Sequence, residues 1–224
     1  RGGTVIKKLL IANRGEIAVR VIRGASELGV RTVAVYSDAD RDSLFTKLAD
    51  EAVHIGESEA TSSYLDISKI IAAAQETGAD AIHPGYGFLS ERPEFAEACE
   101  NAGIVFVGPP ASAMRKLGAK IEAKQLAVEA GVPVTPGFFE SGATEEQLKK
   151  AADDIGYPVM LKASAGGGGR GMRIVRNPGD FESELRIASD EALKGFGDGA
   201  MMVEKLVEQP RHIEVQFLCD RAGN

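Results

Sequence analysis

The chain has 224 residues, of which 44% are hydrophobic, and its formal net charge is −7. This length suits one large domain or two smaller ones, and the apolar fraction is ample for a core. The acidic balance argues against general binding to nucleic acids or anionic membranes, since both need a basic surface. The two cysteines, Cys99 and Cys219, lie far apart, which fits ordinary thiols in a reducing, cytoplasmic type of compartment. No signal peptide or apolar run of membrane-spanning length is evident.

Strand and helix patterns alternate over roughly the first hundred residues, which is typical of a doubly wound parallel sheet of Rossmann-like shape. Apolar runs predict the strands, and apolar residues at helical spacing predict the helices. We expect strands at residues 8–12, 32–36, 52–55, 81–82 and 104–107, and helices at 17–28, 44–48, 66–76 and 93–101.

The first predicted helix follows a tight turn, Asn13–Glu16, that contains a single glycine. One glycine cannot form the pyrophosphate cradle of a dinucleotide site, so NAD binding is excluded here. Gly29 stands where a C-terminal cap is expected. The residues predicted to line the buried face of this helix are Ile17, Val21, Ala25 and Leu28.

Polar and aromatic side chains follow several of the predicted strands. Ligands of doubly wound sheets bind at the carboxyl ends of the strands. We therefore expect a ligand-binding edge formed by Asn13, Ser37, Asp38, His83 and Tyr86.

A second unit is predicted from Gly137 onward, after two short helices at 111–117 and 121–130 and an extended connector at 132–137. Thr144, with Gln147 three residues later, is the signature of a capping box that begins a helix. The remaining expected elements are this helix up to Ile155, a helix at 181–193, and strands at 201–203 and 212–218, followed by a turn at 220–224.

The most informative stretch runs from Pro158 to Arg176, where an apolar run ends on Lys162 and four glycines, Gly166–Gly169, precede a β-like run from Met172. We predict a strand–loop–strand hairpin whose glycines let backbone N–H groups approach a phosphate, with Lys162 supplying positive charge. A flexible glycine linker is the other interpretation. A strand after the glycines excludes the dinucleotide fingerprint. The absence of Gly-Lys, H-R-D and D-F-G motifs excludes a P-loop and disfavours a kinase.

Four motifs agree in order and spacing with one known family: KKLLIANRGEIAVRVIR at 7–23, HPGYGFLSE at 83–91, KASAGGGGRGMR at 162–173, and Glu204 with RHIEVQ at 211–216. Together they resemble biotin carboxylase, the ATP-grasp part of acetyl-CoA, acyl-CoA and pyruvate carboxylases. The resemblance covers essentially the whole chain. It implies ATP-dependent carboxylation of biotin on a carrier by bicarbonate, through carboxyphosphate.

The resemblance also implies a division of the chain. A Rossmann-like domain is expected at 1–117, a helical linker at 118–136, the lid subdomain of an incomplete ATP-grasp domain at 137–206, and the start of its remaining subdomain at 207–224. The residue pattern departs from the family at Ala119, where Asp or Ser is more usual. The Mg²⁺ ligands and catalytic residues of the family are expected beyond residue 224, so no metal ligand or catalytic residue is assigned here.

Site residues follow from the same resemblance. The implied ATP-binding residues are Lys120 and Lys162 near the phosphates, Gly168 and Gly169 in a lid, Met172 in the adenine pocket, Glu204, Lys205, Leu206 and Val207 in an adenine-reading hinge, and His212. Tyr86 and Gly87 are implied near the biotin ring, and Arg23 and Glu27 on a dimer surface. Residues 165–170 are expected to be mobile without nucleotide.

The implied partners are a biotin carboxyl carrier protein or domain, a carboxyltransferase and a second copy of the chain, with no nucleic acid or membrane. The implied setting is fatty acid biosynthesis in the cytoplasm, or the mitochondrial matrix. Two alternatives stay open: another ATP-grasp ligase, such as a carbamoyl-phosphate synthase or a purine-pathway carboxylase, and a catalytically silent nucleotide-binding fragment. The motif HPGYGFLSE separates the first alternative from biotin carboxylase. The 224 residues alone are expected to bind ATP weakly at best, without turnover.

Overall fold

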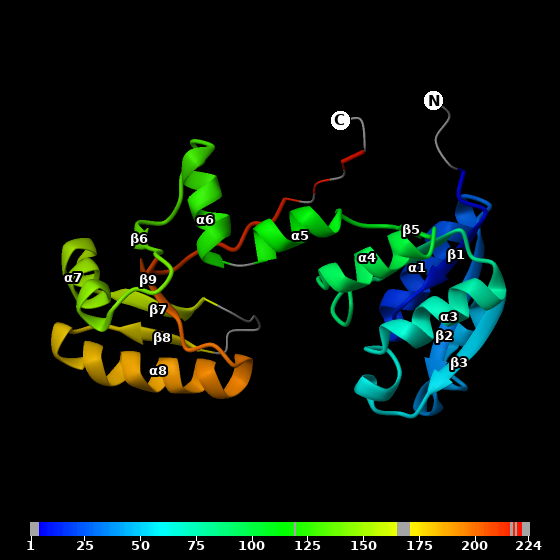
Figure 1. Ribbon diagram of the computed structural model, residues 1–224, viewed down its shortest axis with the longest axis horizontal. Helices are drawn as coiled ribbons and strands as arrows, with labels where there is room; N and C mark the ends of the chain where they lie inside the picture. Colours follow the sequence, from blue (N-terminus) through cyan, green and yellow to red (C-terminus); the bar gives the residue numbers. More distant parts are fainter. Residues whose placement is uncertain (1–4, 119, 165–170, 216, 218, 221–224) are drawn as a thin grey trace. The chain divides into compact units, whose positions relative to one another are not determined.

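The computed structural model describes residues 5–118, 120–164, 171–215, 217 and 219–220. The chain divides into two compact units, residues 1–118 and residues 119–224. Each unit has its own sheet and its own apolar core, and each is described by itself (Figure 1).

The first unit contains a five-stranded sheet in the order β3-β2-β1-β4-β5, and every neighbouring pair is parallel. This confirms the predicted parallel sheet. The chain moves outward from β1 on both sides, so the strand order reverses between β1 and β4, which is where open sheets of this type bind ligands. The strands are β1 (Lys8–Ile11), β2 (Arg31–Ser37), β3 (Glu51–Gly56), β4 (Ala81–His83) and β5 (Val105–Phe106).

Helices cover both faces of this sheet (Figure 1). Side chains of a strand point alternately to its two faces. Accordingly, Leu10 packs in a core with Ile70 and Phe95, whereas Ile11 packs with Ile22 and Phe45. The helices are α1 (Gly15–Glu27), α2 (Leu44–Leu48), α3 (Ile67–Thr77), α4 (Pro93–Asn101) and α5 (Ala111–Gly118), with 3-10 turns at Asp38–Asp40 and Ala60–Ser62.

The buried face of α1 differs from the predicted one. Ala18, Ile22 and Ala25 are buried, whereas Leu28 is 81% exposed. The helix ends at Glu27, and Gly29 adopts a φ of 71° that turns the chain toward β2. The prediction is confirmed at Ala25 and wrong at Leu28, which lies beyond the end of the helix; Ile17 and Val21 are half-buried at the edge of the buried stripe.

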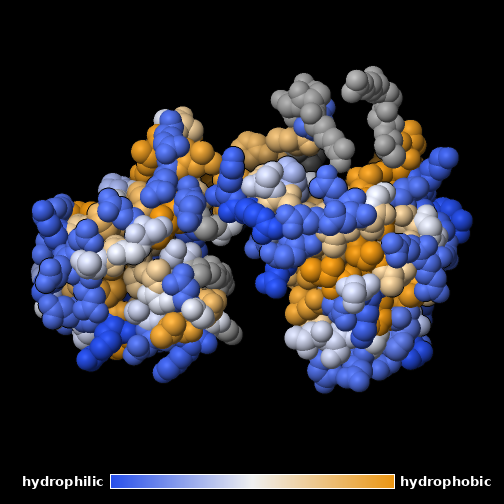
Figure 2. Space-filling model, in the orientation of Figure 1, coloured by the Kyte–Doolittle hydropathy of each residue, from blue (hydrophilic) through white to orange (hydrophobic). Residues whose placement is uncertain are grey.

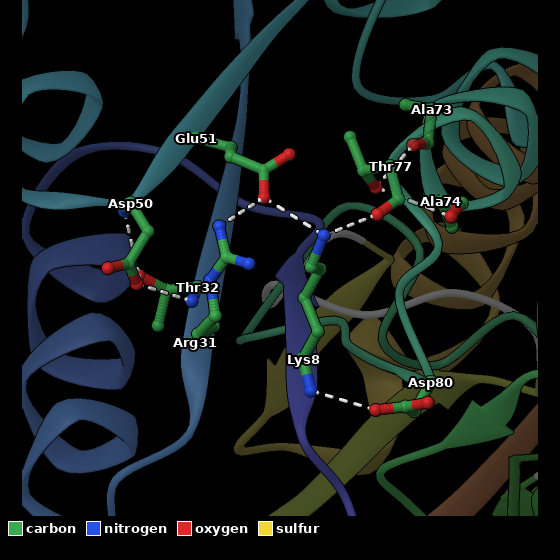
Figure 3. A network of polar contacts seen from close by, with 9 residues as sticks. All are labelled: Lys8, Arg31, Thr32, Asp50, Glu51, Ala73, Ala74, Thr77 and Asp80. Carbon is green, nitrogen blue, oxygen red and sulfur yellow. Dashed lines mark hydrogen bonds and ion pairs between the residues drawn. The ribbon is translucent and has the colours of Figure 1, made fainter.

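A network of polar contacts joins the amino ends of the parallel strands (Figure 3). Nζ of Lys8 lies 2.9 Å from the Glu51 carboxylate and donates to the Thr77 carbonyl at 2.5 Å. The Asp80 carboxylate accepts the backbone N–H groups of Lys7 and Lys8, each at 2.8 Å. The polar groups at the strand ends on this edge therefore pair with one another.

The second unit contains a four-stranded sheet in the order β6-β9-β7-β8, in which the paired strands are antiparallel. The predicted hairpin at Lys162 is confirmed, since β7 pairs with β8 and Lys162 lies opposite Met172. The strands are β6 (Gly137–Phe138), β7 (Val159–Ala163), β8 (Met172–Val175) and β9 (Met201–Lys205); the helices are α6 (Lys120–Glu129), α7 (Glu145–Ile155) and α8 (Phe181–Phe196), with a 3-10 turn at Pro178–Asp180.

Helices α7 and α8 cover one face of the antiparallel sheet. Val159, Leu161 and Val203 point into the core that these helices complete. Because side chains alternate along a strand, the residues between them point to the other face. Lys162 on β7 and Glu204 on β9 therefore share the face that α7 and α8 leave uncovered.

The predicted strand at 212–218 is wrong for the part of it that the structure describes, where no strand is assigned. Ile213 and Val215 are 75% and 68% exposed. Alternating apolar residues favour a strand, but a strand also needs a hydrogen-bonding partner, and the described strands pair only among themselves. The turn predicted at 220–224 lies almost entirely outside the described residues.

The predicted capping box at the start of α7 is confirmed, and it yields a stability prediction. The Thr144 side chain accepts the N–H of Gln147 at 3.2 Å, and the Gln147 side chain accepts the N–H of Thr144 at 2.8 Å. Thr144→Ala should lower the free energy of opening of the first turn of α7 by about 1 kcal/mol. Hydrogen exchange at the Gln147 amide measures this, with Thr144→Ser as the control. An unchanged exchange rate in Thr144→Ala would contradict it.

Candidate functional site

The candidate site of the second unit is built around Glu204, whose side chain is 3% exposed. Its Oε2 accepts a hydrogen bond from Nζ of Lys162 at 2.6 Å. Its Oε1 forms an ion pair with Nζ of Lys124 at 2.5 Å. Two ammonium groups thus hold one buried carboxylate.

The charges of this cluster influence one another. Burial alone would raise the pKa of Glu204, but its contacts with Lys124 and Lys162 outweigh burial and lower it. The pKa of Lys120 is lowered, first by burial and then by the like charge of Lys162, against the opposing influence of Glu204. Three ammonium groups around a single carboxylate leave an excess of positive charge, which favours binding of an anion such as a phosphate.

Helix α6 brings two of the lysines to this face. Lys120 and Lys124 lie one turn apart, so they project from the same side of the helix. Nζ of Lys120 donates to the Ala163 carbonyl at the end of β7, at 3.2 Å. Ile121 between them is 1% exposed. Sequence reasoning missed Lys124, although it lies in the helix predicted at 121–130, four residues after Lys120.

Several apolar side chains of α6 and of the segment after it are exposed, beside polar ones. Leu126, Val128 and Val132 are 42%, 54% and 53% exposed, and Figure 2 shows hydrophobic surface over this helix. Only the side of α6 that carries Lys120 and Lys124 therefore contacts the cluster around Glu204.

The other predicted ATP residues lie at different distances from the cluster. Met172, 39% exposed, stands on β8 opposite Lys162. Lys205 points away, since Nζ donates to the carbonyls of Gly156 and Tyr157 at 2.8 and 3.2 Å. Leu206 follows β9 with its N–H bonded to the Pro158 carbonyl.

The more distal predicted residues are not joined to the cluster by any contact that the structure describes. Val207 is 56% exposed. The His212 side chain, 81% exposed, lies 2.6 Å from the Glu214 carboxylate. Gly168 and Gly169, with the rest of the predicted mobile segment 165–170, lie outside the described residues.

The first unit has a hollow of about 390 Å³ at the point where its strand order reverses. Asn13, 1% exposed, donates from Nδ2 to the carbonyls of Pro84 and Tyr86 at 2.8 and 2.9 Å. Gly85 has a φ of 65°, and a Cβ there would lie 2.6 Å from Nδ2 of Asn13. Asn13 and Gly85 therefore fix the loop after β4. The hollow is lined by Asn13, Arg14, Gly15, Glu16, Ile17, Tyr86, Gly87 and Phe88.

A buried carboxylate, Asp40, anchors Arg14 beside this hollow. Arg14 donates from Nε and from a terminal nitrogen to the two carboxylate oxygens, each at 2.7 Å, and the Tyr64 hydroxyl donates at 2.7 Å. Burial would raise the pKa of Asp40, but the bonds from Arg14 and Tyr64 outweigh it and lower the pKa. Burial, with the neighbouring carboxylate, raises the pKa of Tyr64 to about 12. Sequence reasoning found neither Asp40 nor Tyr64.

The residues predicted along the carboxyl edge divide into two groups. Asn13 and Tyr86 meet at the hollow, whereas Ser37 bonds to Asp40 and Tyr64 and serves the network beneath. Asp38 pairs on the surface with Arg41 and His54. The His83 side chain stabilises the turn that follows it, because its Nδ1 accepts the Gly85 N–H at 3.0 Å. Burial lowers the pKa of His83.

Two further features complete the survey of the described residues. Arg23 and Glu27, predicted on a dimer surface, are both exposed and lie one turn apart on α1. A hollow of about 630 Å³ between α3 and α4 is lined by Ile67, Ser68, Ile71, Ala72, Gln75, Ala98, Asn101 and Ala102. None of these lining side chains titrates, so they offer no acid–base chemistry.

The described residues contain no group of three or more His, Cys, Asp or Glu side chains that could hold a metal ion. None of the helices they form is long and apolar enough to cross a membrane.

Two family descriptions match the chain in succession. "Biotin carboxylase, N-terminal domain" matches residues 5–114, and "Carbamoyl-phosphate synthase L chain, ATP binding domain" matches residues 119–224. The mitochondrial methylcrotonoyl-CoA carboxylase subunit alpha of Rattus norvegicus is 53% identical over 99% of this chain and 31% of its own length. The propionyl-CoA carboxylase alpha chain of Ruegeria pomeroyi is 52% identical over 98% of this chain and 32% of its own. The chain thus spans about a third of these relatives.

Solved structures agree with these matches. A biotin carboxylase from Campylobacter jejuni, in a β,γ-ATP complex, has a TM-score of 0.94 at 52% identity, covering 98% of this chain and 49% of that one. The biotin carboxylase domain of Hydrogenobacter thermophilus 2-oxoglutarate carboxylase, a dimer with MgADP, ADP and bicarbonate, has a TM-score of 0.85 at 47% identity, covering 92% and 45%.

The Asp40 network yields a prediction about acid stability. The pKa of Asp40 in the folded protein is lowered, so its contribution to stability is present above the unfolded pKa and is lost as the pH falls through the folded one. Arg14→Met removes the main cause of the lowering, so the pKa of Asp40 should rise and acid unfolding should begin at higher pH. Titration of the Asp40 carboxyl by ¹³C NMR and acid unfolding by circular dichroism measure the two effects.

The control for this prediction is Lys47→Met, which removes an exposed charge from α2. It should leave both the titration and the unfolding midpoint unchanged. An identical Asp40 titration in the wild type and in Arg14→Met would show that the guanidinium does not set this pKa.

Proposed function

Because this chain belongs to the biotin carboxylase family, we propose that the whole protein carrying it uses ATP and bicarbonate to carboxylate biotin on a carrier. The observation that carries the proposal is the cation-rich cluster around Glu204, with Lys162, Lys124 and Lys120 on the sheet face that α7 and α8 leave uncovered. The relatives solved in a β,γ-ATP complex, and with MgADP and bicarbonate, support this choice of ligands.

The cluster fits the phosphate end of ATP. Lys120 and Lys162 present ammonium groups from two elements, which stabilise negative charge on a transferring phosphoryl group without reorganisation during the reaction. We assign Gly168 and Gly169, which the structure does not describe, to a lid over the phosphates. Closing such a lid excludes water, which protects a labile carboxyphosphate from hydrolysis.

The adenine end is assigned to the strand ends beside the cluster. Met172 offers an exposed apolar side chain on β8. Glu204 supplies a buried acceptor, and Lys205–Val207 supply the hinge, whose backbone is held at Lys205 N–H and Leu206 N–H by the carbonyls of Pro136 and Pro158. We assign His212 to the same nucleotide.

The remaining assignments concern biotin, the metal and the domains. We place biotin near Tyr86 and Gly87. Mg²⁺, when bound with ATP, offsets the charge of the phosphates, and we assign it to no residue of this chain. We propose a Rossmann-like domain at 1–117, a linker at 118–136, a lid subdomain at 137–206 and the start of a further subdomain at 207–224.

We also propose the partners of the protein and the compartment in which it works. We propose that the protein dimerises through the α1 surface that carries Arg23 and Glu27, and that it works with a biotin carrier and a carboxyltransferase. An acyl-CoA is the final acceptor favoured by relatives named for methylcrotonoyl-CoA and propionyl-CoA. Cytoplasm and mitochondrial matrix both suit the two free cysteines, and several relatives are named as mitochondrial.

The first test is the substrate dependence of ADP release by the full-length protein. Release should require both bicarbonate and biotin, since only their joint presence lets carboxyphosphate transfer its carboxyl group. A coupled assay for ADP, with each substrate omitted in turn, measures this. Turnover that depends on ammonia and ignores biotin would instead support a carbamoyl-phosphate synthase activity, the name carried by the family that matches residues 119–224.

The second test concerns Lys162. Lys162→Gln removes an ammonium from the phosphates while Lys124 still pairs with Glu204, so kcat/KM for ATP should fall roughly 100-fold. Steady-state kinetics of the full-length protein measure the loss. Lys150→Met, which removes an exposed charge from α7, is the matched control and should change kcat/KM by less than about twofold. A Lys162→Gln enzyme with normal kinetics would sink the phosphate assignment.

A further inference from the structure

Two lysines hold Glu204, and the proposed function gives a role to only one of them. Lys162 is assigned to a phosphate, yet the structure places its ammonium on the Glu204 carboxylate at 2.6 Å. To reach a phosphate, Lys162 must leave a carboxylate that is 3% exposed. An unpaired charge in such a place is strongly unfavourable, so another group has to neutralise Glu204.

Lys124 is the second partner, and it is held from two sides. Its Nζ lies 2.5 Å from Oε1 of Glu204 and 5.3 Å from the centre of the Phe139 ring, where a cation is attracted to the aromatic face. Gln125, the next residue on α6, bonds to the Phe139 carbonyl at 3.0 Å. A Cβ on Gly137 would lie 2.4 Å from the Phe139 ring and 3.1 Å from Cγ of Glu204. A side chain at position 137 would therefore clash with the Phe139 ring and crowd the Glu204 side chain, so this arrangement requires glycine there.

Lys162 is the partner with a reason to move. Its charge contributes to the lowered pKa of Lys120, which shows that these two ammonium groups repel each other. A phosphate between them would attract both ammonium groups, and these two attractions would offset the repulsion. Lys124, placed between Glu204 and Phe139, has its stabilising contacts where it already lies.

We propose that Lys124 is a positioning residue for nucleotide phosphates: it keeps Glu204 neutralised while Lys162 moves its ammonium from the carboxylate to a phosphate. This inference rests on the proposed function, because it requires a nucleotide at this site. Without Lys124, Lys162 stays on Glu204 and the phosphates lose a contact. A nucleoside without phosphates does not draw Lys162 away, so its binding does not depend on Lys124.

The experiment compares ATP with adenosine in the full-length protein, by competition with a fluorescent ATP analogue. Lys124→Met should weaken ATP binding roughly tenfold, equivalent to about 1.4 kcal/mol, and should change the Kd of adenosine by less than about twofold. Lys124→Arg, which keeps the charge, should restore ATP binding. Lys150→Met is the matched control on α7 and should alter neither ligand.

The same substitution in a Glu204→Gln protein distinguishes neutralisation of Glu204 by Lys124 from a direct attraction between Lys124 and the phosphates. In Glu204→Gln no buried carboxylate needs neutralising, so adding Lys124→Met should change ATP affinity by less than about twofold. A tenfold loss in that background would show that Lys124 attracts the phosphates directly and would overturn the inference. Equal losses for ATP and adenosine in Lys124→Met would assign Lys124 a structural role and would also overturn it.

The remaining outcomes distinguish this inference from the function on which it rests. If the wild type binds ATP and Lys124→Met binds it equally well, the inference fails and the proposed function stands. If the wild type binds no ATP, the proposed function fails and the inference fails with it. Lys124→Gln is measured in parallel, with folding checked by circular dichroism, so that a misfolded methionine variant does not decide the result.

Discussion

The second unit depends on keeping a buried carboxylate charged. Burying Glu204 without partners would be costly, and its two lysine contacts make the ionised form stable. Those contacts need β7 and β9 in one register, α6 in place with Lys124 pointing inward, and a glycine at 137 that leaves room for Phe139. One electrostatic requirement therefore links three segments, α6, β7 and β9, that are separate in the sequence.

The first unit also buries polar side chains that need partners, and it pairs them through both neutral and charged groups. The Asn13 amide ties β1 to the loop after β4, and the Asp40 carboxylate ties Arg14 to Tyr64. In both units a buried polar side chain must find partners on other segments, since unsatisfied polar groups are expensive in an interior. That need holds the loops at the candidate sites in one arrangement, which is the preorganisation that binding and catalysis require.

Much of the fold could be predicted because it follows from local patterns. The alternation of apolar runs with helical spacing predicted the parallel sheet, and Thr144 with Gln147 predicted the start of α7. The failures have physical causes. Leu28 has the right spacing but lies beyond the end of α1, and alternation around Ile213 could not supply a strand partner. These features depend on where an element stops and what lies beside it, which a pattern of residue types does not specify.

By itself, the sequence determined the class of fold, the hairpin around Lys162 and, through the four motifs, the family. Short-range chemistry is enough for these: alternation, capping residues and glycines act over a few positions in the chain. Only the tertiary structure decided which charges meet. Asp40 carries no mark that separates it from surface residues in a chain of 26 basic and 33 acidic residues, and the spacing of Lys124 from Lys120 indicates a shared helix side but not the carboxylate that Lys124 meets. Their partners come from other strands and helices, so their burial and pairing exist only once the sheets have formed.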